Sequence, residues 1–552
     1  MDTRRLILLV IFSFSLLMLW DAWNQQHRPP VPPQQDAAVA QQHQADAPGV
    51  PVPSLPAAAP DAVPVAPQAV EAAPREPIRV RTDLLEAEID PLGGNIVRLV
   101  LNKYPAGSEE SAPLELLAPA QRYAAQSGLI GPNLPTHRSM YQAQAQTYTL
   151  AEGQENLQVR LETSVGEGVR AAKILTFHRD SYLIDVTHEL VNQSAEPIAP
   201  AHAYFQLTRS GETPGRGFFM AQAYTGPAVY TEQDKYRKVP FSDIAEGDAS
   251  FPRTASDGWV AMVQHYFVSA VLPPADTPRE YYARSIGPDL YAAGAIVPIP
   301  AVAPGSSARV NVPLYAGPQE QERLHAAAPG LDVVVDYGWL TIIAEPLFWI
   351  LKWFHSWLGN WGLAIIGLTV LIKLVFFPLS AASYKSMAKM RVVAPRLQKL
   401  REQYGKDRAK MNQAMMELYK TEKINPLGGC LPILVQIPVF IALYWVLLGS
   451  VELRNAPFYG WITDLSEQDP YYILPLLMMV SMFVQTRLSP TPPDPVQAKV
   501  MLAMPLIFGV FFFFFPAGLV LYWLVNNILS IAQQWQITRM IEGGQGKTAS
   551  AK

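Results

Sequence analysis

The sequence predicts an α-helical polytopic membrane protein with six transmembrane helices and a large all-β sandwich domain outside the membrane. Three observations predict this fold class. Of the 552 residues, 49% are hydrophobic and only 16% are charged, whereas about 25% are charged in ordinary soluble domains. Long apolar runs occur at 1–23 and in the C-terminal half, and alternating patterns fill 78–338. The net charge of −4 is unevenly divided: 24–340 holds 22 basic and 34 acidic residues, and 341–552 holds 19 and 11.

The composition also excludes several classes of protein. Long apolar runs exclude a disordered or collagen-like chain. Because the whole sequence has no basic excess, no specific nucleic-acid recognition is predicted. The single cysteine, Cys430, rules out an intramolecular disulfide. No Cys/His cluster has the spacing of a zinc site, so we expect neither a metal nor another cofactor.

The first element, 1–23, is predicted to be an uncleaved signal anchor. Arg4 and Arg5 precede an apolar run, but the small-x-small cleavage site of a removed signal peptide does not follow it. The next element, 24–77, is predicted to be an extended tether. Its part 29–77 holds 13 prolines among Ala, Val and Gln, and this composition cannot bury a core.

The third element, 78–338, is predicted to be an antiparallel β-sandwich domain. Apolar and polar residues alternate along 182–190, which is typical of a half-buried strand. The stretch 89–97 predicts a strand, a glycine turn and a second strand. The more continuous apolar run at 258–272 predicts a core strand. Because such segments recur with few long helical patterns between them, a two-layer all-β domain follows.

The predicted β-domain lacks the sequence signals of catalysis, since no nucleophile elbow, phosphate loop or metal motif occurs in it. His265 lies in an apolar run and is interpreted as a core histidine. Asp185 and Glu189 are interpreted as solvated charges on a strand face. A carbohydrate-binding or protein-binding cleft stays open as an alternative for this domain.

The fourth element, 339–356, is predicted to be an amphipathic helix in the outer headgroup layer. It is rich in tryptophan and phenylalanine, which favour the membrane interface. Glu345, Lys352 and Ser356 are spaced by seven and four residues and so share one stripe. The alternative is an ordinary helix packed beneath the β-domain.

Five further spans follow in the C-terminal half. The segment 357–380 forms the second transmembrane helix, and 427–538 contains helices three to six, with the third near 427–448 and the fourth near 471–484. The last apolar block, 500–537, is too long for one span of about 20 residues. A Pro-Ala-Gly turn at 516–518 divides it into two helices.

The charges of the loops predict the orientation of the spans. The loop 380–425 has 11 basic and four acidic residues, whereas 449–470 has one basic and four acidic residues. Because basic loops stay in the cytoplasm, both termini, including the tail 539–552, are predicted to be cytoplasmic. The acidic β-domain then lies outside.

Lys373 is the most informative residue of the spans. It lies about seven residues before the cytoplasmic end of its helix, roughly 10 Å deep, where a charge costs on the order of 3 kcal/mol. Either its side chain extends to the inner interface, or it lines a water-filled cavity. Thr369 lies four residues earlier on the same helix face. Gln436, Tyr522 and Asn526 add polar groups on other spans, and together these residues favour the cavity. The spans contain no Asp or Glu, which argues against a proton-coupled pump.

The basic segment 381–426 is predicted to form an antiparallel helical hairpin that turns near Gly405. Its methionines give it an adaptable apolar surface, and its charges attract anionic lipid headgroups. The alternative is a purely topological role for the charges. The residues expected to make the docking surface are Lys385, Lys389, Arg391, Arg396 and Lys399.

Several motifs resemble those of the bacterial membrane protein insertase family YidC, in the Gram-negative form with a large periplasmic domain. In the C-terminal half the motifs are DYGW at 336–339, KWFHS at 352–356, GNWG at 359–362, SMAKM at 386–390, NPLGGC at 425–430 and PAGLVLY at 516–522. In the β-domain they are DPLGG at 90–94 and QHYFVSA at 264–270.

The resemblance implies a core of five helices around a hydrophilic groove, open to the cytoplasm and to lipid. Lys373 falls where the family carries the positive charge of the groove, often as Arg. Lys lacks the planar bidentate fork of Arg. Thr369 and Trp523 fall where the family contacts its substrate.

The resemblance also implies the function. The protein would move nascent transmembrane segments from the cytoplasm into the inner membrane, alone or with the Sec translocon, without covalent chemistry. The partners implied are nascent membrane proteins, the Sec translocon, the ribosome and anionic lipids. The large domain would lie in the periplasm.

Two other functions compete with insertion. A solute transporter or channel with an external binding domain predicts internal repeats and a polar pore, and 357–537 shows no clear inverted repeat. A membrane-anchored sugar-binding or sugar-modifying protein predicts that function resides in 78–330. The polar groups in the spans and the basic hairpin argue against it.

Overall fold

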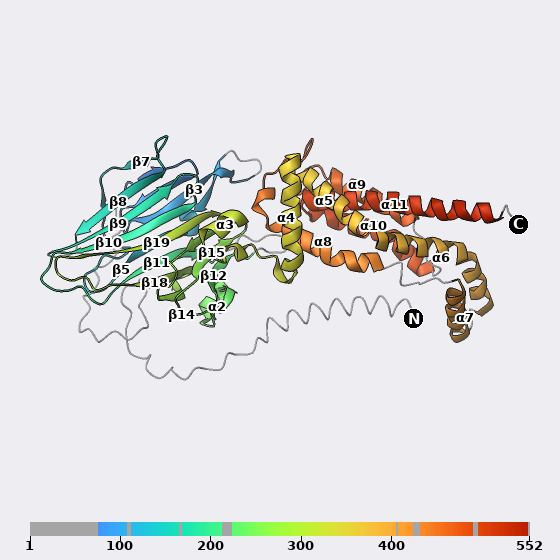
Figure 1. Ribbon diagram of the computed structural model, residues 1–552, viewed down its shortest axis with the longest axis horizontal. Helices are drawn as coiled ribbons and strands as arrows, with labels where there is room; N and C mark the ends of the chain where they lie inside the picture. Colours follow the sequence, from blue (N-terminus) through green and yellow to red (C-terminus); the bar gives the residue numbers. More distant parts are fainter. Residues whose placement is uncertain are drawn as a thin grey trace. The chain divides into compact units, whose positions relative to one another are not determined.

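The computed structural model describes residues 75–107, 112–164, 168–211, 224–404, 407–422, 431–488 and 495–549. The predicted anchor at 1–23, most of the tether and Cys430 lie outside these residues. The described chain forms two compact units. The β-domain extends to Gly338 and includes the distant segment Gly449–Arg454, and the helical unit takes the rest of the chain from Trp339 on (Figure 1).

The β-domain consists of two sheets, which confirms the predicted all-β sandwich. The ten-stranded sheet has the order β14-β17-β18-β11-β5-β3-β2-β1-β7, with β4 paired to β3. Its strands are β1 (Ile78–Arg81), β2 (Leu85–Asp90), β3 (Asn95–Pro105), β4 (Pro113–Leu117), β5 (Ala124–Ile130), β7 (Thr147–Thr149), β11 (Ala201–Ser210), β14 (Thr254–Ala255), β17 (Arg279–Gly287) and β18 (Leu290–Ile299).

The nine-stranded sheet has the order β13-β12-β15-β16-β19-β10-β9-β8-β6. Its strands are β6 (Gln142–Ala143), β8 (Asn156–Ser164), β9 (Val169–His178), β10 (Leu183–Asn192), β12 (Gly226–Thr231), β13 (Lys235–Lys238), β15 (Trp259–Gln264), β16 (Phe267–Val271) and β19 (Ser307–Pro318). Short helices complete the domain: η1 (Pro119–Gln121), α2 (Phe241–Glu246), α3 (Gln321–Ala327) and η2 (Leu331–Val334).

The predicted alternation is confirmed along β10, where Ile184, Val186 and His188 are buried between β9 and β19. The prediction for Glu189 is wrong. This residue is 6% exposed, and its carboxylate accepts hydrogen bonds from two guanidinium groups, that of Arg160 on β8 at 2.7 Å and that of Arg309 on the adjacent β19 at 2.5 Å. Two cations therefore compensate the burial of one anion.

The apolar run at 258–272 is two strands, and this corrects the predicted single core strand. β15 and β16 pair as an antiparallel hairpin, and Tyr266 in the turn between them has a φ of 70°. His265 therefore lies in a turn, half-buried and stacked on the ring of Tyr266, and is no core histidine. Apolar residues on both sides conceal the turn, because it contains none of the usual Gly, Pro or Asn signals.

A buried lysine joins the two sheets at the predicted glycine turn. Gly93 and Gly94 have φ values of 81° and 57°, a backbone conformation that glycine adopts without steric cost. Lys173 on β9 is 0% exposed. Its Nζ donates to the Gly93 carbonyl at 2.5 Å and to the Ser127 carbonyl on β5 at 2.9 Å. The ammonium thus connects the nine-stranded sheet to two places on the ten-stranded one.

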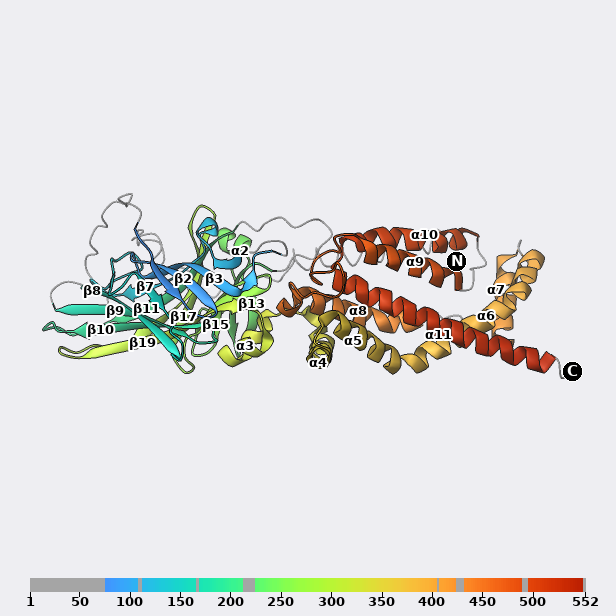
Figure 2. The same cartoon turned by 90° about the horizontal axis from the view of Figure 1, so that it is seen from above.

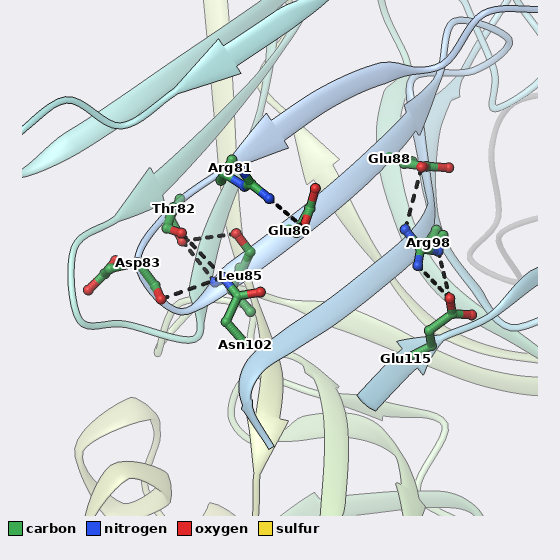
Figure 3. Close-up of polar contacts among 9 residues, drawn as sticks. All are labelled: Arg81, Thr82, Asp83, Leu85, Glu86, Glu88, Arg98, Asn102 and Glu115. Carbon is green, nitrogen blue, oxygen red and sulfur yellow. Dashed lines mark hydrogen bonds and ion pairs between the residues drawn. The ribbon is translucent and has the colours of Figure 1, made fainter. Parts of the chain in front are cut away.

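Polar contacts of a different kind lie along β1, β2 and β3 (Figure 3). Thr82 closes the turn between β1 and β2 by accepting a hydrogen bond from the backbone N–H of Leu85 at 2.9 Å. Arg98 on β3 pairs with Glu115 at 2.5 Å and with Glu88 at 3.5 Å. Because these ion pairs are partly exposed, each contributes about 0–1 kcal/mol, and the buried core between the sheets stabilises the domain.

The helical unit contains long helices and short 3₁₀ segments. They are η3 (Gly338–Leu340), α4 (Thr341–Leu358), α5 (Trp361–Val375), α6 (Phe377–Tyr404), α7 (Arg408–Thr421), α8 (Leu431–Gly449), α9 (Ile473–Leu488), α10 (Pro495–Phe511), η6 (Phe512–Phe514) and α11 (Ala517–Ala549), with η5 (Val451–Leu453) in the segment that belongs to the β-domain. In Figure 2, α9 and α10 lie side by side, and α11 is the longest ribbon.

By length and hydropathy, no helix of the described residues passes alone as a membrane span. The pair of α5 and the first part of α6 passes together, with a bend of 63° between them. Three shorter apolar helices cover Val435–Gly449, Ile473–Leu488 and Lys499–Phe514. Between η6 and α11 the chain turns at Phe515 and Pro516, where the sequence predicts the last two spans to divide.

Candidate functional site

A polar cavity lies among α5, α6, α8, α9, α10 and α11. It encloses about 1270 Å³ of empty space, counted together with the open solvent at its mouth. Its polar lining includes Lys373, Gln436, Asn526 and Ser530. Many large apolar side chains of α9 and α10 are exposed, whereas these polar groups face the cavity.

Lys373 points toward α11. Its Nζ donates to the Ser530 hydroxyl at 2.7 Å, and the Ser530 hydroxyl donates to the backbone carbonyl of Asn526 at 2.7 Å. Both Ser530 and Asn526 are buried. The ammonium is therefore held by a neutral partner inside the unit.

Gln436 on α8 faces the same cavity. Its amide Nε2 donates to Asn526 Oδ1 at 2.6 Å. Phe440, one turn further along α8, packs edge-on against Trp523 with ring centroids 4.8 Å apart. The indole Nε1 of Trp523 is buried and has no hydrogen-bond partner among the described residues. The cavity thus combines amide groups with an aromatic wall.

α11 supplies more polar lining residues than any other helix and bonds to four other helices within one short stretch. Beside the contacts of Asn526 to α8 and of Ser530 to α5, its other polar side chains reach α6 and α9. These are Asn527 to Ser481 Oγ at 3.2 Å, Gln533 to the Phe377 carbonyl at 3.5 Å and Gln534 to the Leu488 carbonyl at 3.0 Å. Side chains from α11 therefore set the spacing of the helices around the cavity.

Most of the residues expected in the groove meet in this cavity. Lys373, Gln436, Tyr522, Trp523 and Asn526 line it.

Thr369 does not line the cavity. It is 0% exposed, and its hydroxyl donates to the Ile365 carbonyl of its own helix at 2.6 Å. A threonine inside a helix can satisfy itself in this way, so its spacing from Lys373 does not place its hydroxyl in the cavity.

Sequence reasoning missed Ser530, Gln534, Tyr384 and Ser383, which also line the cavity. A signal existed for the first two. Residues 522, 526, 530 and 534 follow one another at intervals of four and therefore share one face of α11. An isolated serine in an apolar helix carries no further signal, because it serves as well for helix packing.

The loop between α8 and α9 contacts the first turns of α5 and α11. Backbone N–H groups at the start of α11 donate to this loop, from Ala517 to the Glu467 carbonyl at 2.7 Å and from Gly518 to the Leu465 carbonyl at 2.9 Å. At the start of α5, the Asn360 amide donates to the Pro457 carbonyl at 3.1 Å. The loop therefore connects the first turns of α5 and α11.

Asp469 holds this loop in shape. It is 1% exposed, and its carboxylate accepts three hydrogen bonds. The donors are the Trp461 indole at 2.9 Å, the backbone N–H of Tyr471 at 3.0 Å and the backbone N–H of Leu474 at 2.7 Å. The last bond also satisfies a free N–H at the start of α9.

α4 has one buried apolar face and one exposed face that carries tryptophans. Leu347, Phe348 and Leu351 are buried on the face that packs toward α5, whereas Trp349 is 68% and Trp357 is 75% exposed. Large exposed indole rings on one face are typical of a helix that lies at a membrane interface.

α6 and α7 pack against each other through Val393 and Leu397, which contact Met390, Met415 and Leu418. Among the residues expected to dock lipid, Lys385, Arg396 and Lys399 are exposed and Lys389 is half-buried. The side chain of Arg391 lies outside the described part of the chain, as does the turn at Gly405.

The chemistry of the cavity is that of binding. Among the described residues that line it there is one cation and no carboxylate. Such a set of amide, hydroxyl and ammonium groups can hydrogen-bond peptide groups and carboxylates.

Comparisons with known proteins agree with these features. A family model described as the YidC periplasmic domain matches residues 77–350, and one described as the 60Kd inner membrane protein matches residues 353–545. The chain is 58% identical over 548 residues to a membrane protein insertase YidC of Aromatoleum aromaticum, covering 98% of each chain. It is 55% identical over 569 residues to that of Nitrosospira multiformis, covering 100% of each. Among solved structures, it is similar to an active YidC insertase with the first transmembrane domain resolved, at 18% identity and a TM-score of 0.38, covering 84% of this chain and 92% of that one.

Proposed function

The chain belongs to the YidC family of membrane protein insertases of the bacterial inner membrane, and we propose that its polar cavity carries the hydrophilic part of a nascent transmembrane segment. The observation that carries this proposal is the position of Lys373, whose ammonium lies against Ser530 in a cavity lined by amides and hydroxyls. A wet, positively charged site among helices with apolar outer surfaces suits a substrate that is part polar and part apolar.

The proposed orientation has six spans, both termini in the cytoplasm and the β-domain in the periplasm. The alternation of basic and acidic loops supports it. The first span lies outside the described residues. In this orientation the cavity opens toward the cytoplasm, and the loop stabilised by Asp469 closes its periplasmic end.

The physical role of the cavity is to lower the cost of moving polar groups. An unsatisfied backbone group in hydrocarbon costs several kcal/mol, and a charge at the centre of a span costs on the order of 3 kcal/mol. Amide groups of Gln436 and Asn526 replace part of the lost hydration, and Lys373 offsets the charge of an acidic tail. The apolar part of the substrate then moves into lipid beside the helices.

Two other elements would position the protein and its substrate. The exposed tryptophans of α4 would lie in the outer headgroup layer. The basic residues of α6 would dock to anionic lipid and receive the nascent chain. They are Lys385, Lys389, Arg391, Arg396 and Lys399. The Sec translocon and the ribosome are the partners proposed by family membership.

The reaction proposed is transfer without covalent chemistry. The cavity offers no nucleophile paired with a base among its described lining residues. Neither a cofactor nor a nucleotide is required by the mechanism.

The proposal is tested with the purified full-length protein in sealed liposomes. A single-span substrate with an acidic tail is added, and protection of the tail from external protease is measured with wild type, Lys373→Ala and Lys373→Gln. We expect wild type to protect the tail and Lys373→Ala to protect it about 10-fold less, as loss of a charged hydrogen bond implies.

The two variants separate two roles of Lys373. Protection by Lys373→Gln at the wild-type level would mean that polarity and hydration suffice. Protection by wild type no greater than that by empty liposomes would contradict insertion by this chain alone and favour a transporter or a simple anchor.

A further inference from the structure

The contact between Lys373 and Ser530 decides where the charge of the cavity lies. A lysine about two turns from the end of a span can place its ammonium at the interface by extending its side chain. Instead the Nζ of Lys373 lies 2.7 Å from the Ser530 hydroxyl, on a different helix. The Ser530 hydroxyl on α11 therefore takes the place of a water molecule as a partner of the ammonium.

The hydroxyl oxygen of Ser530 is available to accept this hydrogen bond. It is 3% exposed, and its hydroxyl hydrogen is used in the bond to the Asn526 carbonyl. The oxygen therefore keeps its lone pairs for a donor. An ammonium has three donors, so Lys373 can bind Ser530 and still offer N–H groups to a substrate.

The bend between α5 and α6 lies beside the same contact. Lys373 stands three residues before Phe376, where α5 gives way to α6 at an angle of 63°. Gln533, three residues after Ser530, reaches the carbonyl of Phe377 just past the bend. One turn of α11 thus contacts the chain on both sides of the bend.

We infer that Ser530 is a positioning residue, which keeps the Lys373 ammonium inside the cavity and directed toward the acidic or carbonyl groups of a substrate. The inference rests on the proposed function of the cavity. It adds a specificity: Ser530 matters for substrates with acidic tails and little for neutral ones, because it acts only through the charge of Lys373.

The first test compares two substrates with identical spans, one with two Asp and one with two Asn in the translocated tail. Full-length wild type, Ser530→Ala and Ser530→Thr are placed in sealed liposomes. We expect Ser530→Ala to lower protection of the acidic tail about 5-fold and that of the neutral tail less than about 2-fold. Ser530→Thr keeps the hydroxyl and should protect both tails like wild type.

Two controls isolate the contact. Ser481→Ala removes a buried serine that bonds α11 through Asn527 instead of Lys373, so any loss should be equal for both tails. In the Lys373→Gln background, adding Ser530→Ala should not lower protection of the acidic tail any further. The inference would be overturned if Ser530→Ala lowered protection of both tails equally. It would also be overturned if Ser530→Ala lowered protection of the acidic tail further in the Lys373→Gln background.

The second test does not depend on insertion. The rate at which a water-soluble amine-reactive ester labels Lys373 is measured by mass spectrometry in lipid nanodiscs, with Lys352 on α4 as the internal reference. If Ser530 holds the ammonium, labelling of Lys373 rises several-fold in Ser530→Ala and stays at the wild-type rate in Ser530→Thr and Ser481→Ala. Unchanged labelling in Ser530→Ala would refute the positioning role.

The two tests keep the inference and the proposed function apart. A labelling response without protection of any tail would contradict the proposed function and leave the contact intact. If protection of the acidic tail depends on Lys373 but does not change in Ser530→Ala, the proposed function stands and the positioning role of Ser530 is contradicted.

Discussion

Single buried basic groups carry much of the pH response of the β-domain. His137 lies against the Tyr204 hydroxyl, with Nδ1 at 2.5 Å. Burial, and then the positive charges of Arg138 and Lys173, lower the pKa of His137 to about 4. Burial alone lowers the pKa of Lys173 to about 7. Both groups therefore resist protonation in the folded state, and neither has a carboxylate in its hydrogen bonds.

The first prediction is that the β-domain becomes more stable as the pH rises. For His137 the unfolded chain binds more protons than the folded one between pH 6.5 and 4, so stability is lost as the pH falls through that range. For Lys173 the same excess holds between about pH 10.4 and 7, so stability still rises above neutrality. Denaturant unfolding of the full chain, followed by β-sheet circular dichroism, should show a loss of roughly 2–3 kcal/mol from pH 7 to 4.5.

A His137→Gln variant provides the control for this prediction. It keeps a polar group beside Tyr204 and removes the titration, so the acid-side loss should shrink while the rise above pH 7 remains. An acid-side loss of the same size in the variant would assign the effect to other groups.

The glycine at position 93 is a second residue on which the domain depends. With φ at 81°, a side chain there is strained, and a Cβ would lie 1.9 Å from the His137 carbonyl oxygen. We predict that Gly93→Ala lowers the free energy of unfolding of the β-domain by about 3 kcal/mol or more. Gly153→Ala has a similar φ and nothing within 4 Å, so it serves as the matched variant and should cost about 1 kcal/mol.

At the scale of elements, the loop between α8 and α9 depends on one carboxylate. Asp469 accepts three hydrogen bonds while 1% exposed. Hydrogen bonds to a charged group are worth about 1.5–3 kcal/mol, and the contacts of this loop reach the first turns of α5 and α11. The connection between the first turns of α5 and α11 through this loop therefore depends on this carboxylate.

We predict that Asp469→Ala loosens the loop and opens the closed end of the cavity. Full-length protein in liposomes should then leak a small trapped dye several-fold faster than wild type. Asp469→Asn keeps one acceptor oxygen for the bonds from Trp461 and Tyr471 and should leak much less. Equal leakage from wild type and Asp469→Ala would mean that the loop does not seal the cavity.

The elements also show what a sequence can predict. The alternation of apolar and polar residues in the sequence identified the strands, because the residues of half-buried strands such as β10 alternate in burial. It did not resolve β15 from β16, since the turn at Tyr266 has apolar neighbours. Helix spacing placed Tyr522 and Asn526 on one face of their helix, and both side chains line the cavity. It failed for Thr369, whose hydroxyl bonds its own backbone, because spacing gives the direction of a side chain and leaves its partner open.

At the scale of the whole molecule, the β-domain is discontinuous in sequence. Its unit ends at Gly338 and is joined by Gly449–Arg454. Val451 and Leu453 in that segment are each 1% exposed. Arg454 donates to the Ala106 carbonyl at 2.9 Å and lies over the ring of Phe267. A short later segment of the chain therefore belongs to the compact unit of a domain whose strands lie far earlier in the sequence.

We predict that Leu453→Ala destabilises the β-domain by about 2–4 kcal/mol, as loss of a buried leucine side chain implies. Hydrogen exchange of the full chain should show faster exchange in peptides of β3 and β16. Leu465→Ala removes a leucine that is 2% exposed from the part of the same loop that belongs to the helical unit. It should leave exchange in those strands unchanged, and a shared effect of both variants would contradict the assignment.

The discontinuity has a consequence for how the protein itself is made. Ribosomes add residues in order, at about 5–20 per second, so the β-domain is synthesised long before residues 449–454. In the proposed orientation those residues reach the periplasm only after α8 has crossed the bilayer in the correct direction. A chain whose third span enters backwards leaves its β-domain incomplete, with the sites for Leu453 and Arg454 empty. Completion of this domain therefore reports, on the outside of the cell membrane, that the topology within the membrane is correct.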